Sequence, residues 1–248
     1  FDLNDMGYMK ETDYLMNETE IMYRQTDIWK IFRYNAFTLS QKNMWNYGGT
    51  PFSNNASLRW QSMTMNRYEW DVKETFAWNW QDSRLLRGGP DVRFGSYFLT
   101  SAKFNTDKAK RMMFMFKYEG DHNFEGNRFN TISPSLTFRL GNHVYLSGQL
   151  DYAWNTDEMQ YVATTSPLSS SSLTPYYYVM GHMDQKTYGL TLKLQVNVTP
   201  DISIQFYGAP FTSIAKYDDF KLAADTKSHT FENRFQRIDP DHLTYVDG

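Results

Sequence analysis

The histidines are the first residues to consider, because an imidazole can act as a general base or bind a metal near neutral pH. The chain has five of them, at His122, His143, His182, His229 and His242. None stands at metal-ligand spacing from another, and the chain has no H-E-x-x-H motif. It also lacks G-x-S-x-G, a Walker loop and a dinucleotide fingerprint. The sequence therefore predicts no catalytic residue, no metal ligand and no cofactor, which favours a protein that is not an enzyme.

His182 has an acidic neighbour that gives it a more specific interpretation. It stands in Gly181-His182-Met183-Asp184, where the imidazole can pair with the carboxylate of Asp184. A membrane-bound hydrolase would add a nucleophilic serine to such a pair. Serines occur at 169–172, although a serine run is more typical of a flexible loop. We interpret His182 and Asp184 as loop residues that could contact a ligand, and a hydrolase stays open as the alternative.

Two other segments could contact a ligand from a loop. Arg87 begins an R-G-G-P run, in which the glycines allow positive φ and the proline restricts the exit, so a tight turn is the favoured interpretation. The alternative is that Arg87 faces an anionic sugar or lipopolysaccharide. Tyr176 and Tyr177, followed by Tyr178, could stack against sugar rings, and packing within a tyrosine-rich loop explains them equally well.

Several acidic residues fall in the same predicted loops. They are Asp121, Glu125, Asp157, Glu158 and Asp184. Calcium prefers several oxygen ligands, but no segment resembles an EF-hand loop. Solvated loop charge is therefore the favoured interpretation of these carboxylates.

The composition indicates what kind of elements must position these residues. Of the 248 residues 41% are hydrophobic and 17% aromatic, and the mean hydropathy is −0.64. Aromatic residues mixed with polar ones suit a sheet with one apolar face and one solvated face. The chain has no cysteine, which excludes disulfides and thiolate metal sites, and a net charge of −3 gives nucleic-acid binding no support. No apolar stretch approaches the 18 residues or so of a transmembrane helix.

Strict alternation is the strongest structural signal in the chain. Over 144–154 and 187–198 the even positions are almost all apolar and the odd positions mostly polar or small. The segments 131–140, 112–119 and 70–80 alternate in the same way, although Glu74 interrupts the apolar face of the last. This is the period of a strand, and a run of about 9–11 residues is long enough to cross a membrane.

The turns divide into two kinds. Short polar breaks are expected near Thr26-Asp27, Asn66-Arg67, 106–110, Gly141-Asn142 and 199–201, and longer connections at 47–51, 82–91, 120–127 and 156–182. Short turns at one end and long loops at the other are typical of outer-membrane barrels. We therefore predict an all-β, antiparallel up-and-down transmembrane β-barrel. About ten strands are expected, at 16–25, 29–46, 52–64, 68–81, 92–104, 110–120, 128–140, 143–155, 183–198 and 202–214.

The two faces of these strands lead to different expectations. Aromatic residues near strand ends on the apolar face would form the interfacial girdles of a barrel. The other face carries both signs of charge, with Lys73, Lys117, Lys193 and Arg139 against Asp71, Glu119 and Asp151. Such a mixture can form internal ion pairs and favours a plugged or narrow barrel over a wide pore. A soluble lectin-like sandwich with aromatic residues in its core is the alternative.

Several motifs in order along the whole chain resemble one family of Bacteroidota proteins. They are VTPDISIQFY at 198–207, APF at 209–211, KYDDFK at 216–221, FDLNDMG at 1–7, WNYGG at 45–49, LRGGP at 86–90, QYV at 160–162 and DQKT at 184–187. That family joins a module similar to carbohydrate-binding family nine to a C-terminal barrel of unknown function. The resemblance implies that 1–248 is an incomplete barrel domain in the cell outer membrane, with a carbohydrate-binding-like domain upstream and final strands downstream.

The function expected from these observations is surface binding, uptake or anchoring by an outer-membrane barrel, linked to glycan handling. Its expected partners are outer-membrane lipid and lipopolysaccharide, with glycan as a further candidate and no nucleic acid. An outer-membrane hydrolase acting on glycan or lipid and a passive narrow pore are the two alternatives.

Overall fold

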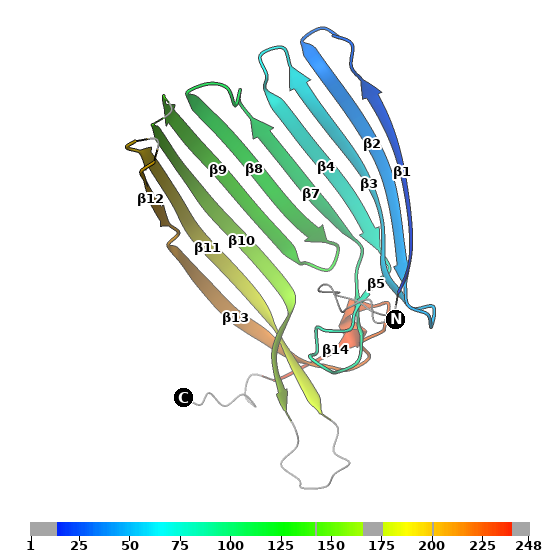
Figure 1. The fold of residues 1–248 in the computed structure, drawn as a ribbon. Coiled ribbons are helices and arrows are strands. Elements are labelled where there is room, and N and C mark those ends of the chain that lie inside the picture. Colours follow the sequence, from blue (N-terminus) through cyan, green and yellow to red (C-terminus); the bar gives the residue numbers. More distant parts are fainter. Residues whose placement is uncertain (1–13, 142, 166–175, 200, 240–248) are drawn as a thin grey trace.

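The computed structural model describes residues 14–141, 143–165, 176–199 and 201–239, and it shows one large curved antiparallel sheet (Figure 1). Its long strands are β1 (Leu15–Gln25), β2 (Phe32–Trp45), β3 (Pro51–Thr64), β4 (Glu69–Trp78), β7 (Tyr97–Asn105), β8 (Met112–Asn123), β9 (Arg128–Leu140), β10 (Val144–Thr165), β11 (Tyr177–Asn197), β12 (Ser203–Gly208) and β13 (Phe211–Ala223). The short elements are β5 (Trp80–Asp82), β6 (Val92–Phe94), the 3₁₀ turn η1 (Phe231–Arg234) and β14 (Phe235–Arg237). The predicted all-β antiparallel class is confirmed.

The long strands follow one another as an up-and-down meander. Each is hydrogen-bonded to the next, in the order β1-β2-β3-β4-β7-β8-β9-β10-β11-β13-β14. β12 and β13 share one position beside β11, where β12 pairs with its C-terminal part and β13 with its N-terminal part. The break falls at Pro210, which has no N–H to donate to the ladder, while its carbonyl accepts from the Leu190 N–H at 3.0 Å.

The two ends of the sheet differ only partly as the turn pattern predicts, because the connections 46–50 and 124–127, where longer loops were expected, have five and four residues. The connections β1–β2, β3–β4, β7–β8, β9–β10 and β11–β12 are short and lie at one end, which we call the short-turn end (Figure 1). The other end, which we call the loop end, carries the segment 79–96 with β5 and β6, the hairpin turn after β8 and the segment that follows β13.

The prediction of a long irregular connection over 156–182 was wrong. β10 continues to Thr165 and β11 begins at Tyr177, and the two strands stay paired as far as Thr165↔Tyr177. The register shifts between Asp157 and Gln160 and again between Tyr161 and Ala163. Such bulges break the alternation of side chains, so the sequence pattern ends before the strands do. β8 also extends further than predicted, to Asn123. The predicted 120–127 loop is therefore a tight turn of residues 124–127.

One face of the sheet is apolar across its whole width. Cα partners in successive strands place apolar or aromatic side chains in one continuous row, made of Tyr23, Phe37, Trp60, Val72, Ala102, Tyr118, Ile132, Tyr152 and Tyr188. Large side chains on this face are exposed, with Leu150 at 58% and Leu39 at 55%. We call it the apolar face.

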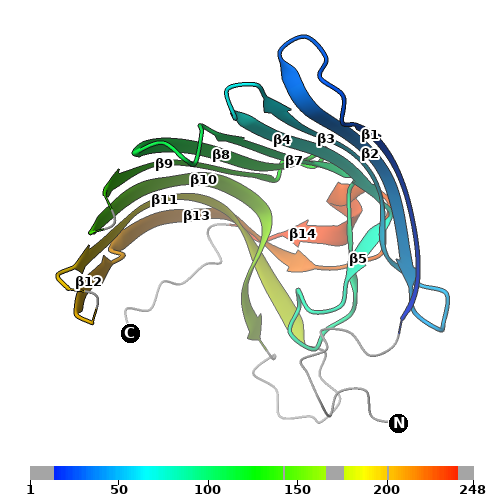
Figure 2. The same ribbon diagram turned by 45° about the horizontal axis from the view of Figure 1, so that its top comes forward.

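The opposite face is mostly polar. The row displaced by one residue is made of Arg24, Ala36, Gln61, Asp71, Lys103, Lys117 and Ser133. Because strand side chains alternate strictly, this shift of one residue separates an apolar surface from a polar one. Tyr97 on the polar face contacts Trp80 of β5 at 5.7 Å, and β5 lies inside the curve of the sheet (Figure 2). The polar face is therefore the concave one.

Charged residues of the polar face form local networks. Arg59 donates to Asp71 at 2.8 Å, Lys117 pairs with Glu119 at 2.7 Å, and Gln149 donates to Asp151 at 2.8 Å. The expected mixture of both signs is present, but the partner of Asp71 is Arg59, which the sequence did not indicate. Lys193 instead faces the Tyr207 ring at 5.7 Å, and Arg139 donates to the Lys108 carbonyl at 3.2 Å.

The sheet is open in the part of the chain that the structure describes. There β1 is hydrogen-bonded to β2 alone and β12 to β11 alone. No helix among the described residues is long and apolar enough to cross a membrane.

Candidate functional site

The loop end holds a small folded unit that we call the cap, made of 80–96 and 224–237. Its centre is a buried apolar cluster in which Leu86 and Val92 of the cap pack with Met159 of β10 and Met180 of β11. Each of these four side chains is at most 1% exposed. Since the large apolar side chains of the strands are mostly exposed, this cluster is the closest equivalent of a hydrophobic core in the described residues.

The two parts of the cap are joined to each other by hydrogen bonds to backbone carbonyls. The Arg93 N–H donates to the Thr226 carbonyl at 2.9 Å, and the Thr226 hydroxyl donates to the Asp91 carbonyl at 2.7 Å. Figure 2 shows β14 and β5 side by side inside the curve of the sheet. The cap therefore covers the concave face at the loop end.

Arg234 fixes the cap to the sheet. Its guanidinium donates to both carboxylate oxygens of Glu125, at 2.9 and 2.8 Å, and also to the Arg93 and Ser228 carbonyls, each at 2.8 Å. Glu125 further accepts the Gly95 N–H at 2.9 Å. Arg234 is 1% exposed, so its charge is stabilised by these partners rather than by water.

The residues predicted to contact a ligand all lie near this end. Arg87 has φ 49° and Gly88 φ 103°, and the Gly89 N–H donates to the Leu86 carbonyl at 3.2 Å, which is the tight turn that the R-G-G-P run favoured. A Cβ on Gly89 would lie 2.6 Å from the Tyr178 ring, so close packing requires glycine there. The Arg87 guanidinium lies over the Tyr161 ring at 4.5 Å, and Tyr176 and Tyr177 are exposed.

His182 lies on β11 among three carboxylates from three strands. Its Nδ1 is 3.0 Å from Glu158 Oε1, and its Nε2 is 3.5 Å from Asp184 Oδ2 and 4.0 Å from Asp218 Oδ1. The predicted His182–Asp184 pair is therefore present, but Glu158 is nearer. Glu158 lies on β10 and Asp218 on β13, so their approach depends on sheet register, which the sequence does not show.

The carboxylates determine the charge of this imidazole. Burial lowers the pKa of His182, but the Glu158 carboxylate and the hydrogen bonds to Glu158 and Asp184 raise it, and the result lies above the ordinary 6.5. The carboxylates therefore stabilise the charged imidazolium relative to the neutral imidazole. For the neighbouring Asp157, burial raises the pKa of the carboxyl group, and the backbone N–H of Met159 partly offsets the increase.

A buried lysine links this cluster to the cap. Lys221 of β13 is 3% exposed, and its Nζ lies 3.7 Å from both Glu158 and Asp219. On its other side it faces the Phe231 and Phe235 rings of the cap, at 5.3 and 5.4 Å. We call His182, Glu158, Asp184, Asp218 and Lys221 the rim cluster, and its geometry suits charge pairing beside a folded cap.

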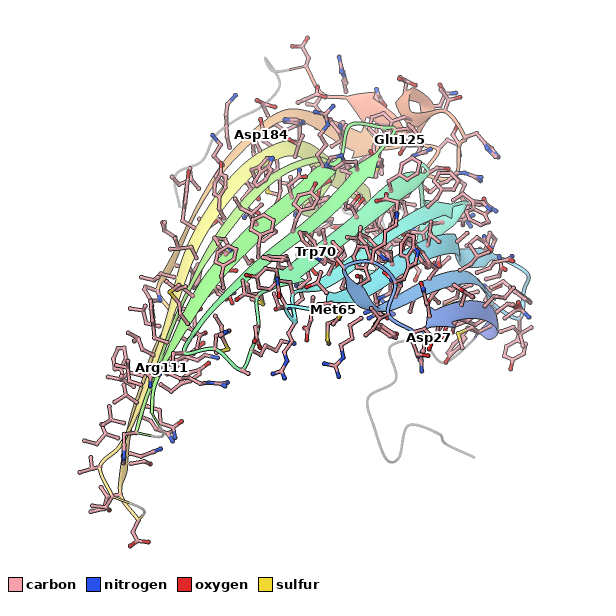
Figure 3. All side chains as sticks on the ribbon, turned by 90° about the horizontal axis from the view of Figure 1, so that it is seen from above. Asp27, Met65, Trp70, Arg111, Glu125 and Asp184 are labelled. Atoms are coloured by element: carbon pink, nitrogen blue, oxygen red, sulfur yellow. The ribbon has the colours of Figure 1, made fainter. Side chains whose placement is uncertain are left out.

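The chemical alternatives can now be compared with this geometry. Within the described residues, the polar side-chain contacts of His182 are all with carboxylates, and no group of three or more histidine or acidic residues could hold a metal ion. Glu125, one of the acidic loop residues, pairs with Arg234. The serines at 169–172 lie outside the described residues. In Figure 3, Glu125 and Asp184 lie toward the loop end, where the cap is, and Met65 and Arg111 lie toward the short-turn end.

Comparison of the chain with known protein families identifies the family to which it belongs. A family model described as a domain of unknown function, DUF5916, matches residues 1–244. No curated protein and no solved structure matches the chain. Because the family model covers nearly the whole sequence, the chain belongs to the DUF5916 family, a domain of unknown function.

Proposed function

We propose that the chain is the wall of an outer-membrane β-barrel whose loop end is closed by the cap, and that it works as a surface binding or anchoring protein. The observation that carries the proposal is the apolar band of the convex face. On this face the band spans 132–140 of β9, 144–154 of β10 and 188–198 at and just after the end of β11. Polar side chains follow in each strand at Asn130, Thr156 and Lys186.

The height of the band supports a membrane rather than a soluble partner. A run of eleven residues extends about 36 Å along a strand and spans about 25 Å of membrane at a tilt of about 45°. Aromatic rings lie at its boundaries, as in the girdles of membrane barrels. Tyr152, Trp154 and Tyr188 stack at the loop-end boundary, and Tyr68 and Trp70 contact Phe104 at the other.

The turns support one orientation, because the long segment 79–96 that joins β4 to β7 lies at the loop end. In membrane barrels the short turns face the periplasm and the longer loops face outward. The cap and the rim cluster would then be at the cell surface. Further strands would close the sheet, and the sequence resemblance supports these strands and an upstream carbohydrate-binding-like domain in a Bacteroidota protein. Glycan handling is part of the proposal on that basis.

The cap favours binding or anchoring over a passive pore. It covers the concave face at the loop end, and Arg234 holds it there through a buried ion pair. The polar face also carries ion pairs between neighbouring strands, such as Arg59–Asp71. A wide water-filled channel needs an open lumen, whereas the cap covers part of the concave face at the loop end.

The proposal is tested by recording planar-bilayer conductance of the full-length protein and by screening the same preparation on a glycan array. We expect glycan binding without steady single-channel conductance. Steady conductance without glycan binding would overturn the proposal in favour of a pore. Turnover of a glycan or lipid substrate that His182→Gln abolishes would overturn it in favour of a hydrolase.

A further inference from the structure

A groove at the short-turn end combines apolar and cationic side chains. It has a volume of about 500 Å³ and lies between the turn joining β3 to β4 and the turn joining β7 to β8. The two turns are neighbours because β4 pairs with β7, with Trp70 opposite Phe104. No part of the rim cluster or the cap contributes to this groove.

The floor of the groove is continuous with the apolar band. Met65, Tyr68, Met112 and Phe114 line it, and each is between 38% and 58% exposed. Behind them the Phe104 ring contacts Tyr68 at 5.9 Å and Phe114 at 6.4 Å. An apolar chain lying along the band would therefore reach the groove without crossing a polar surface.

Two cationic side chains stand at the edge of the groove. Arg67 comes from the first turn and Lys110 from the second, and both are exposed. Among the described residues neither side chain takes part in an ion pair. The one carboxylate that lines the groove is Asp107, which is 9% exposed and accepts the Ala109 N–H at 2.9 Å. The Asp107 carboxylate is directed into its own turn, so the exposed charge at the edge of the groove is positive.

The two turns are held in place by neighbouring contacts. The Glu69 carboxylate forms an ion pair with Lys108 and accepts the Asn105 side-chain N–H at 3.3 Å, which ties β4 to the second turn. The Thr106 N–H donates to the Phe114 carbonyl at 2.9 Å, and the Arg67 N–H donates to the Thr64 carbonyl at 2.9 Å. The groove is thus a built feature of the sheet end rather than a gap between mobile loops.

We infer that this groove binds one anionic phospholipid, with the phosphate of the headgroup between Arg67 and Lys110 and an acyl chain along Met112 and Phe114. The inference rests on the proposed membrane location. Basic residues beside a membrane span attract anionic headgroups, and an exposed apolar floor is what distinguishes a lipid site from a site for free phosphate. Bound lipid would anchor the short-turn end at a fixed depth.

The experiment uses full-length protein, purified in detergent and returned to vesicles of phosphatidylethanolamine with or without phosphatidylglycerol. Retained lipid is counted by native mass spectrometry after release from the vesicles. We expect phosphatidylglycerol to be retained in preference to phosphatidylethanolamine, and Arg67→Asn or Lys110→Gln to weaken that preference about fivefold each. Asparagine is chosen because Arg67 has φ 60°, a conformation that asparagine tolerates. Lys186→Gln, at the other boundary of the band, is the matched control and should change nothing.

The outcomes separate the two proposals. Protein that alkaline carbonate removes from vesicles would overturn the membrane location and the lipid site with it. If the protein stays in the vesicles but retains both lipids equally, the lipid site alone would be overturned. The same would follow if Lys186→Gln weakened the preference as much as Arg67→Asn and Lys110→Gln do. Displacement of the lipid by glycerol phosphate as readily as by phosphatidylglycerol would show a site for soluble phosphate and would also overturn it.

Discussion

Arg234 forms a bidentate ion pair with Glu125, which joins the end of the cap to the hairpin of β8 and β9. The two residues are 109 positions apart in the sequence. Arg234 is almost fully buried, so each of its donors needs a protein acceptor, and Glu125 supplies two of them. The contact joins the segment after β13 to the sheet, inside its curve.

Arg234→Gln should release the cap while leaving the sheet intact. Removing one partner of a buried ion pair costs about 3–5 kcal/mol, because the other charge stays buried without compensation. We expect faster hydrogen exchange at the Ala224 amide, which donates to the Arg234 carbonyl at 2.8 Å, measured in the full-length protein. Arg237→Gln is the control, since its ion pair with Asp219 is exposed and should contribute under about 1 kcal/mol. Equal exchange in the two variants would contradict a role for Arg234 in holding the cap.

The stability of the rim cluster should depend on pH through His182. Its pKa in the folded protein lies above 6.5, because Glu158 and Asp184 outweigh the opposing effect of burial. The stabilisation is then fully present below about pH 6.5 and is lost as pH rises through the folded value. Thermal unfolding of the full-length protein from pH 6 to pH 9 should show this decrease, and His182→Gln should flatten it. His143→Gln, at the exposed short-turn end, should leave the slope unchanged. A slope that survives in His182→Gln would assign the pH dependence to another group.

A charge in the middle of the apolar band should prevent insertion. Leu150 and Gln149 are neighbours on β10 that point to opposite faces. Leu150→Arg should lower stability in vesicles by about 2–4 kcal/mol, the cost of a basic residue at the midplane on the lipid face of a barrel. Gln149→Arg should be tolerated, because the polar face already carries charge. The measurement is the folded fraction recovered after dilution of urea-unfolded full-length protein into vesicles. Equal recovery of both variants would contradict the assignment of the faces.

Glu74 is a charged residue on the apolar face, and its replacement should stabilise the inserted protein. It lies on the apolar face between Val72 and Phe76 and accepts a hydrogen bond from the Thr100 hydroxyl at 2.7 Å. Glu74→Gln keeps a carbonyl acceptor for Thr100 and removes the carboxylate, so we expect a gain of about 1 kcal/mol in vesicles. Glu119→Gln on the polar face, which loses the ion pair with Lys117, should give no gain. A loss of stability in Glu74→Gln would indicate that the carboxylate has a partner within the membrane.

Much of the sheet could be predicted from the sequence because alternation reports the faces of a strand directly. Residues 144–154 show this, since their apolar even positions form the band. Prediction ended where the bulges at Asp157 and Tyr161 interrupt the period, and the strands beyond these positions appeared as a loop. The turn at Arg87 could be predicted because glycine and proline determine it locally.

The candidate site was predictable only where its parts are neighbours in sequence. His182 and Asp184 are two residues apart on one strand, so their pairing could be expected. Glu158 and Asp218 approach His182 through the register of β10 and β13 with β11, and Arg234 reaches Glu125 through the return of the chain after β13. Neither local propensity nor periodicity contains that information. The lipid groove also depends on the pairing of β4 with β7.

The central claim is that the convex face of the sheet meets lipid, and nitroxide accessibility tests it most directly. The chain has no cysteine, so single cysteines at positions 149 and 150 can carry a spin label in the full-length protein reconstituted in vesicles. The account predicts that the label at Leu150→Cys collides with oxygen dissolved in the bilayer and is shielded from a water-soluble nickel chelate. At Gln149→Cys, inside the curve, collisions with oxygen should be reduced. Ready access of the nickel chelate to the label at position 150 would contradict the claim and indicate a sheet that functions in water.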